Sequence, residues 1–169
     1  PISVVLYELI CKWALESNNV LVWVWTVLQW NCMAHMASID PLEFHNFSKG
    51  VDSIIVQYND SKADNAGENV SPKNLFANPF IPYICTFSTN DKIFQKKGKD
   101  GSAASTYCSQ LSNILLQYID IVNGHTRPLH TNTQIFRKGS AVHATSGTTC
   151  PPPLSPVANC GEWLLGEKV

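Results

Sequence analysis

The feature that most constrains the fold is a stretch of 23 residues, 17–39, that contains no Asp, Glu, Lys or Arg. Its centre, residues 20–28, is strongly apolar and contains two tryptophans. About 20 apolar residues are enough for a helix to span a bilayer, but this stretch is interrupted by Asn18, Asn19, Gln29, Asn31 and His35. We therefore expect a helix buried on all sides in a domain core. A membrane helix and, because of the valines, a strand are the alternatives.

The composition is that of one folded domain. The chain has 169 residues, of which 44% are hydrophobic and 15% charged. This length can bury a sizeable core, and this composition is not that of a disordered protein. The six cysteines include no Cys-x-x-Cys pair, and the histidines lack metal-ligand spacing. The sequence therefore contains neither a zinc-ribbon motif nor a histidine pair with metal-ligand spacing.

Two short runs of β-prone residues, 53–58 and 74–77, suggest a small sheet. Turn residues lie between them, including Asn59, Asp60 and Gly67. The two runs predict a hairpin-like platform, and Lys62 falls in its connection.

The rest of the chain is predicted to be helical. The clearest amphipathic helix follows the polar residues 95–101, where apolar residues recur at helical spacing: Tyr107, Leu111, Ile114, Leu115, Tyr118 and Val122. Gly124 is expected to cap this helix. Another helix is expected over 137–145, ended by Gly147, and a final helical stretch follows the prolines at 151–153. The fold class is thus mainly α with a small β-hairpin or sheet.

The charge is unevenly distributed along the chain. The formal net charge is -1, but residues 92–169 carry 8 Lys or Arg against 4 Asp or Glu, a net charge of +4. This part could present a weakly basic surface to a polyanion. Its lysine cluster, residues 92–99, is either a solvated loop or a sequence-independent phosphate contact.

The C-terminal quarter carries a resemblance to a known family. Arg137 is followed by Lys138-Gly139-Ser140-Ala141, and Gly161-Glu162-Trp163 comes later. From about residue 20 onward the chain resembles the catalytic domain of tyrosine recombinases, the phage-integrase-like enzymes, and in particular those of Crypton-type eukaryotic mobile elements. The resemblance implies the integrase-like fold and a reaction in which a tyrosine attacks a phosphodiester of double-stranded DNA. It also implies that copies of the protein assemble on DNA and that the protein is nuclear or otherwise intracellular. It implies no metal and no organic cofactor, because strand transfer through a phosphotyrosine needs neither, and it implies no membrane partner.

The resemblance also assigns roles to individual residues. Arg137 matches the family's second arginine, Lys62 the hairpin lysine that protonates the leaving oxygen, and Trp163 the later His or Trp position. His35 stands where the first arginine is expected, and Gln134 where the histidine is expected. With an ordinary pKa of about 6.5, a histidine is mostly neutral at pH 7 and cannot replace a permanent bidentate cation.

We therefore expect residues 1–169 to form a single recombinase-like catalytic domain, incomplete at its C-terminus because the nucleophilic tyrosine would lie beyond Val169. The first residue, Pro1, leaves open that the chain begins within a longer protein. The expected function is DNA strand cleavage and rejoining by a degenerate site. The alternatives are a non-catalytic DNA-binding remnant and a secreted or membrane-associated glycoprotein with sequons at Asn46, Asn59 and Asn69.

Each site residue also has an ordinary structural explanation. Arg137 alone could be a surface ion-pair partner and Lys62 a solvated turn lysine. Trp163 could be a core residue. His35, expected within the apolar helix, could be a hydrogen-bonded core histidine. Only the convergence of these positions in space would favour a shared anion site.

Overall fold

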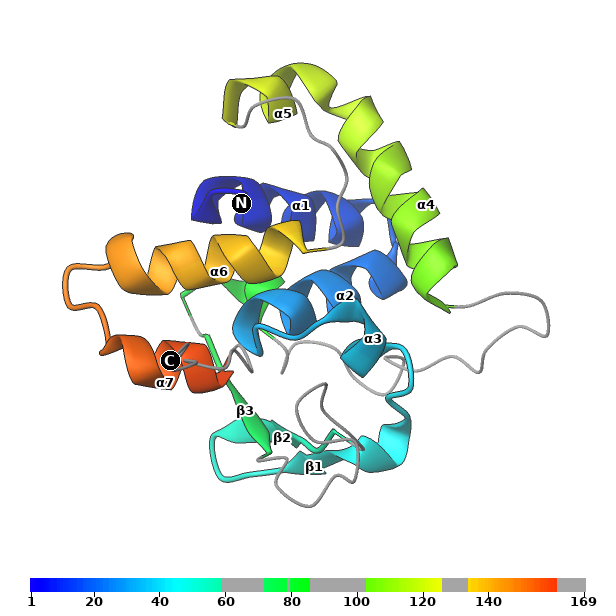
Figure 1. The fold of residues 1–169 in the computed structure, drawn as a ribbon. Helices are drawn as coiled ribbons and strands as arrows, with labels where there is room; N and C mark the ends of the chain where they lie inside the picture. The colour runs from blue at the N-terminus through cyan, green and yellow to red at the C-terminus, as the bar shows by residue number, and fades with distance from the viewer. Residues whose placement is uncertain (59–71, 79, 86–102, 126–133, 161–169) are drawn as a thin grey trace, which may run out of the picture.

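The chain folds into a body of helices with a small sheet along one side (Figure 1). The structure, a computed structural model, describes residues 1–58, 72–78, 80–85, 103–125 and 134–160. The α-helices are α1 (Val4–Glu16), α2 (Val20–Asn31), α3 (Met36–Ile39), α4 (Ala103–Gln117), α5 (Ile119–His125), α6 (Ile135–Ser146) and α7 (Leu154–Cys160). The strands are β1 (Phe47–Lys49), β2 (Ser53–Val56) and β3 (Lys73–Phe76), with 3-10 helices η1 (Phe44–Asn46) before β1 and η2 (Pro82–Ile84) after β3.

Helix α2 lies at the centre of the helical body. It contacts α1, α3, α4 and α6, and every residue from 22 to 30 is buried. The Asn19 side chain caps its first turn by accepting a hydrogen bond from the Val22 N–H at 3.2 Å. The expected helix buried on all sides is confirmed, and the strand alternative is wrong. Across the described ranges, we find no helix with both the length and the apolar character that a membrane span requires.

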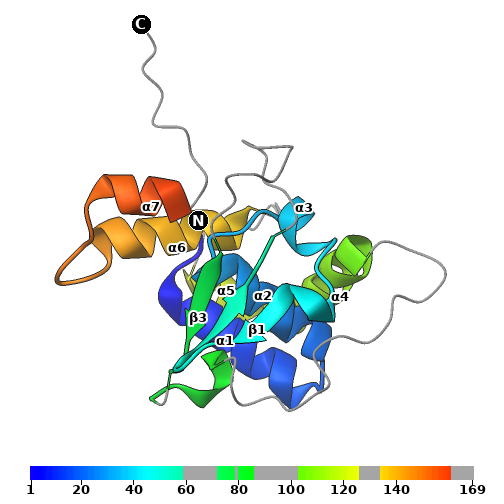
Figure 2. The ribbon, with the colours of Figure 1, turned by 90° about the horizontal axis from the view of Figure 1, so that it is seen from below.

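The sheet is antiparallel, with strand order β1-β2-β3. Strand β2 falls within the first predicted run, and β3 begins at Lys73, one residue before the second run. The two strands pair with Ile54 opposite Leu75, so the expected platform is confirmed. Figure 2 shows the sheet in front of α1 and α2, on the side that is lowest in Figure 1. Val56 and Leu75 join the main core from this side. The predicted hairpin connection with Lys62 lies outside the described residues.

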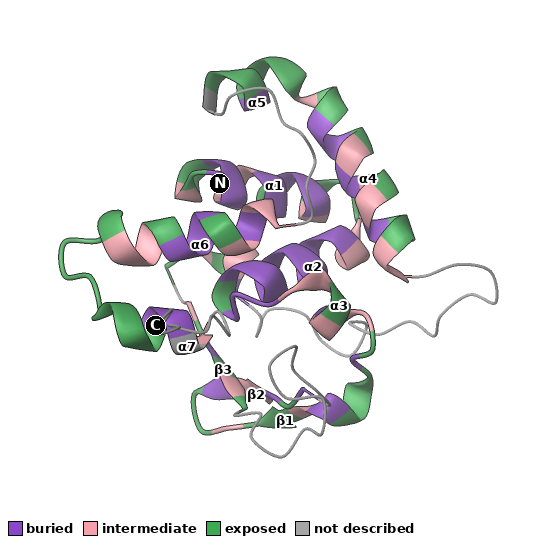
Figure 3. Ribbon diagram, viewed as in Figure 1, coloured by how far each residue is buried: buried purple, intermediate pink, exposed green. Residues whose placement is uncertain are grey.

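The predicted amphipathic helix is two helices, α4 and α5, that meet at Tyr118. The ring of Tyr118 stacks on Trp13 of α1, with the ring centroids 4.1 Å apart. Figure 3 shows the buried residues of α4 on the side that faces the helical body. The prediction that Gly124 caps this helix is wrong, because α5 continues through it to His125. A Cβ at Gly124 would meet nothing within 4 Å, so neither packing nor a turn requires glycine there.

Helix α6 begins within two residues of the predicted start, and Gly147 caps its end through an N–H bond to the His143 carbonyl at 2.8 Å. The helix lies very close to its neighbours. A Cβ at Gly139 would lie 2.6 Å from the Ile2 carbonyl oxygen and 2.9 Å from the Trp30 ring. The Ser140 hydroxyl donates to the Trp30 carbonyl at 2.6 Å. Small residues on α6 therefore set its distance from α2. The final helix, α7, packs against α6.

Candidate functional site

Two of the expected site residues meet although they lie 99 residues apart in the chain. His35 precedes α3, and its Nδ1 accepts a hydrogen bond from the Ala37 N–H at 3.2 Å. Its Nε2 lies 3.5 Å from the side-chain nitrogen of Gln134, the residue before α6. Folding thus brings together the positions at which the resemblance expects the first arginine and the histidine.

The hydrogen bond to Nδ1 determines what the imidazole can offer at this site. A neutral ring that accepts at Nδ1 carries its proton on Nε2, which then acts as a donor toward Gln134. The amide oxygen of Gln134 is the matching acceptor, and rotating the amide by half a turn brings it to that position. The pair can therefore hold its two side chains in place, but in this state His35 does not provide a positive charge.

Arg137 stands one helical turn after Gln134 on α6, so the two side chains project from neighbouring positions. The residue is half-buried, and its Nε is enclosed below the surface. The Nε atom therefore meets little solvent, and the guanidinium is a permanent cation with planar donors suited to phosphate. As the third residue of α6, Arg137 lies in the first turn, where the helix dipole favours an anion. Arg137, Gln134 and His35 are therefore the part of the predicted site that the described residues contain.

The other two predicted site residues, Lys62 and Trp163, lie outside the described residues. A different lysine of the sheet is described. Lys73 begins β3, and its Nζ donates a hydrogen bond to the carbonyl oxygen of Cys160, the last residue of α7, at 3.0 Å. Lys73 was not singled out from the sequence, although it directly precedes the predicted strand. Its ammonium links the sheet to the C-terminal helix.

The described tyrosines Tyr7 and Tyr107 are unsuited to act as nucleophiles. Burial raises the pKa of Tyr7 well above its ordinary value and has the same effect on Tyr107. The Tyr107 hydroxyl lies 3.5 Å from both Thr26 and Gln29 inside the core. Both phenols thus stay protonated at neutral pH and serve the packing of the helices.

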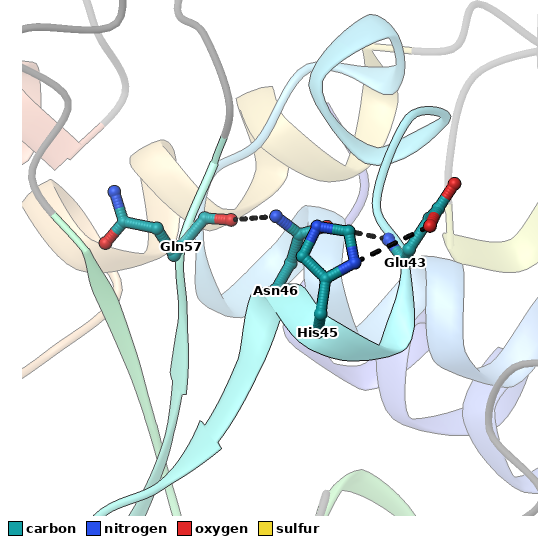
Figure 4. Close-up of polar contacts among 4 residues, drawn as sticks. All are labelled: Glu43, His45, Asn46 and Gln57. Carbon is teal, nitrogen blue, oxygen red and sulfur yellow. Dashed lines mark hydrogen bonds and ion pairs between the residues drawn. The ribbon is translucent and has the colours of Figure 1, made fainter.

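Asn46, the first of the three sequons, is held inside the fold (Figure 4). Its Oδ1 accepts from the Glu43 N–H at 2.8 Å, and its Nδ2 donates to the Gln57 carbonyl at 3.0 Å. The side chain is only 4% exposed. His45 forms a nearby ion pair with Glu43, at 3.5 Å between Nδ1 and Oε2, on the solvent side. A glycan on Asn46 Nδ2 is incompatible with this arrangement, whereas Asn59 and Asn69 lie outside the described residues.

Comparison with protein-family models, curated proteins and solved structures gives no match. Within the described part of the chain, no group of three or more His, Cys, Asp or Glu side chains is arranged to hold a metal ion. All six cysteines are described and are free thiols.

Proposed function

We propose that this chain is a tyrosine-recombinase-like domain that binds the phosphate backbone of double-stranded DNA and whose substituted site is poorly suited to strand cleavage. The observation that carries the proposal is the approach of His35 to Gln134, with Arg137 one turn further along α6. If the resemblance were accidental, the residues to which it assigns one shared function would be expected to lie apart in the fold. The mainly helical fold with a small antiparallel sheet is compatible with this class.

The chemistry of the three residues favours binding over catalysis. Arg137 offers a planar, permanently charged donor to phosphate oxygens. His35 in place of an arginine removes a second such donor, and the loss of one preorganised donor typically costs about 3 kcal/mol, a factor of 100 to 1,000 in rate. Gln134 donates or accepts hydrogen bonds but does not transfer a proton at neutral pH. We therefore favour the non-catalytic DNA-binding form of the proposal.

Charge along the chain supports the same partner. The net charge of +4 over residues 92–169 includes Arg137 and Lys138 on α6. Binding through such charges depends on counterion release and is therefore weak, salt-dependent and insensitive to sequence. In this proposal the domain acts in the nucleus of a eukaryotic cell, or otherwise inside the cell, and several copies can bind one DNA molecule.

The test is a DNA-binding titration of the wild type and of Arg137→Ala at several salt concentrations. We expect the variant to bind at least a few-fold more weakly, with a log-log salt slope shallower by about 1, because one phosphate contact is lost. Lys12→Ala is the control: it removes the same charge from α1, where Lys12 is exposed and pairs with Glu16 at 3.9 Å. Equal binding by wild type and Arg137→Ala would remove Arg137 from the proposed phosphate site.

A further inference from the structure

Two cysteines from distant parts of the chain meet where α2 ends. Cys32 caps the C-terminus of α2 and is 1% exposed, whereas Cys160, the last residue of α7, is partly exposed. The Cys160 thiol points at the Cys32 carbonyl oxygen, 3.8 Å away. Cys160 also packs against a small apolar cluster that contains Met33, the residue after Cys32. The two thiols therefore belong to one site at the contact between α2, α6 and α7.

The distance from the Cys160 thiol to the Cys32 carbonyl sets an upper limit on the separation of the two Cα atoms. Standard bond lengths place a carbonyl oxygen and a thiol sulfur each within about 3 Å of their own Cα, so the Cα atoms of Cys32 and Cys160 lie within about 9 Å of each other. A disulfide needs about 4.4–6.8 Å. A shift of roughly 2 Å in the end of α7 is sufficient even at the upper limit. Helix α7 has only seven residues, and its buried Val157 belongs to the small cluster with Met33 and not to the main core, so a shift of its end leaves the main core in place.

We propose that Cys32 and Cys160 form a reversible disulfide by exchange with a low-molecular-weight disulfide of the glutathione type. The Cys160 thiolate attacks one sulfur of the oxidised glutathione, and the first glutathione leaves and takes up the Cys160 proton. Cys32 then attacks the sulfur of Cys160, and the second glutathione leaves with the Cys32 proton. Two protein thiols are oxidised and one glutathione disulfide is reduced to two thiols. The inference does not depend on DNA binding.

The surroundings determine the order of the two steps. Cys160 is the thiol that an external disulfide can reach, because Cys32 is buried. Burial raises the pKa of Cys32 to about 12, although a hydrogen bond from Tyr58 and the charge of Lys73 partly oppose this rise. The ammonium of Lys73 is fixed at this site by its bond to the Cys160 carbonyl, and its charge favours the thiolate form of Cys32. The second step is therefore the slow one, and its rate increases with pH.

The test treats the full chain, carrying Cys150→Ser because Cys150 is exposed, with oxidised glutathione under native conditions. We expect the mass to fall by two hydrogens and peptide mapping to join Cys32 to Cys160. The bond closes a loop of 127 intervening residues, so we expect a rise in Tm on the order of 10 °C that a reductant reverses. Detection of a stable glutathione adduct on Cys160 with Cys32 still free would overturn the proposal.

Further variants in the same background separate the two roles. Cys32→Ser should retain one glutathione on Cys160, because the resolving thiol is missing. Cys160→Ser should leave Cys32 unmodified, because solution disulfides do not reach it. Cys108→Ser is the matched control, since Cys108 contacts Met36 at 3.9 Å elsewhere in the fold and should still allow the Cys32–Cys160 bond. If Cys32→Ser fails to fold, mapping of the background protein alone still decides the question, and a bond between any other pair refutes the inference.

Discussion

Replacing the two helical glycines Gly139 and Gly124 with alanine should have opposite effects on stability. On intrinsic propensity alone, each Gly→Ala change inside a helix stabilises by about 0.5–1 kcal/mol. At Gly124 a Cβ would meet nothing within 4 Å, so Gly124→Ala should realise this gain. At Gly139 the same atom would lie 2.6 Å from the Ile2 carbonyl oxygen, which is backbone and cannot rotate away.

The cost at Gly139 follows from this clash. Helix α6 must move away from α2, and overpacking of this kind costs about 1–3 kcal/mol. The movement also weakens the buried bond from Ser140 to the Trp30 carbonyl, which contributes about 1 kcal/mol. After the propensity gain is subtracted, Gly139→Ala should lower the free energy of unfolding by about 2 kcal/mol. For a domain of this size that corresponds to a fall of roughly 4–8 °C in Tm.

Urea unfolding of both variants measures the two effects under the same conditions. The midpoint should fall for Gly139→Ala and rise for Gly124→Ala, with unchanged m values if both variants still unfold in two states. A Gly139→Ala protein as stable as the wild type would show that α6 does not approach Ile2 and Trp30 as closely as described. The close packing of α6, the helix that carries Arg137, against α2 would then lose its support.

Three other predictions concern single side chains. His35→Arg should strengthen DNA binding several-fold and steepen the salt slope by about 1 in the same titration, although losing the Ala37 cap costs about 1 kcal/mol; unchanged affinity would contradict the phosphate site. Asn46→Ala should destabilise by about 2 kcal/mol in urea, whereas Gln57→Ala should cost less, because it keeps the backbone carbonyl that accepts the hydrogen bond from Asn46. Stability should fall as pH rises from 9 toward 12, because unfolded Cys32 ionises from its ordinary pKa of 9.0 while the folded thiol ionises only near 12; a urea midpoint unchanged between pH 8 and pH 10.5 would refute this.

The elements that the sequence predicted best are those in which one environment, such as burial on every side, selects the residue type at many consecutive positions. Helix α2 was recognisable because burial on every side excludes charge over its whole length. Strands β2 and β3 were found from short β-prone runs with turn residues between them. Strand β1 has three largely exposed residues and no apolar pattern, and its start is fixed by Asn46 bonding to Gln57 across the sheet. A hydrogen bond between such distant residues leaves no periodic pattern in the sequence.

Helix α1 was covered only by the general expectation of helix and was not singled out, although its buried residues Leu6, Ile10 and Ala14 recur at helical spacing. The grouping of His35, Gln134 and Arg137 came from the resemblance to a family, not from spacing. Their approach depends on how closely α6 packs at Gly139, which a single sequence does not reveal. The pair Cys32 and Cys160 left no motif for the same reason, since its two residues come from the ends of different helices.

The central position of α2 has a consequence for how the chain folds during its synthesis. Helix α6, which covers one side of α2, is translated more than a hundred residues later. Until α6 has emerged from the ribosome, part of the tryptophan-rich surface of α2 is not packed against α6, and the nascent chain exposes an aggregation-prone apolar surface. Contacts between such distant segments also slow the final closure. The nascent chain should therefore depend on chaperones chiefly in the interval between the emergence of α2 and that of α6.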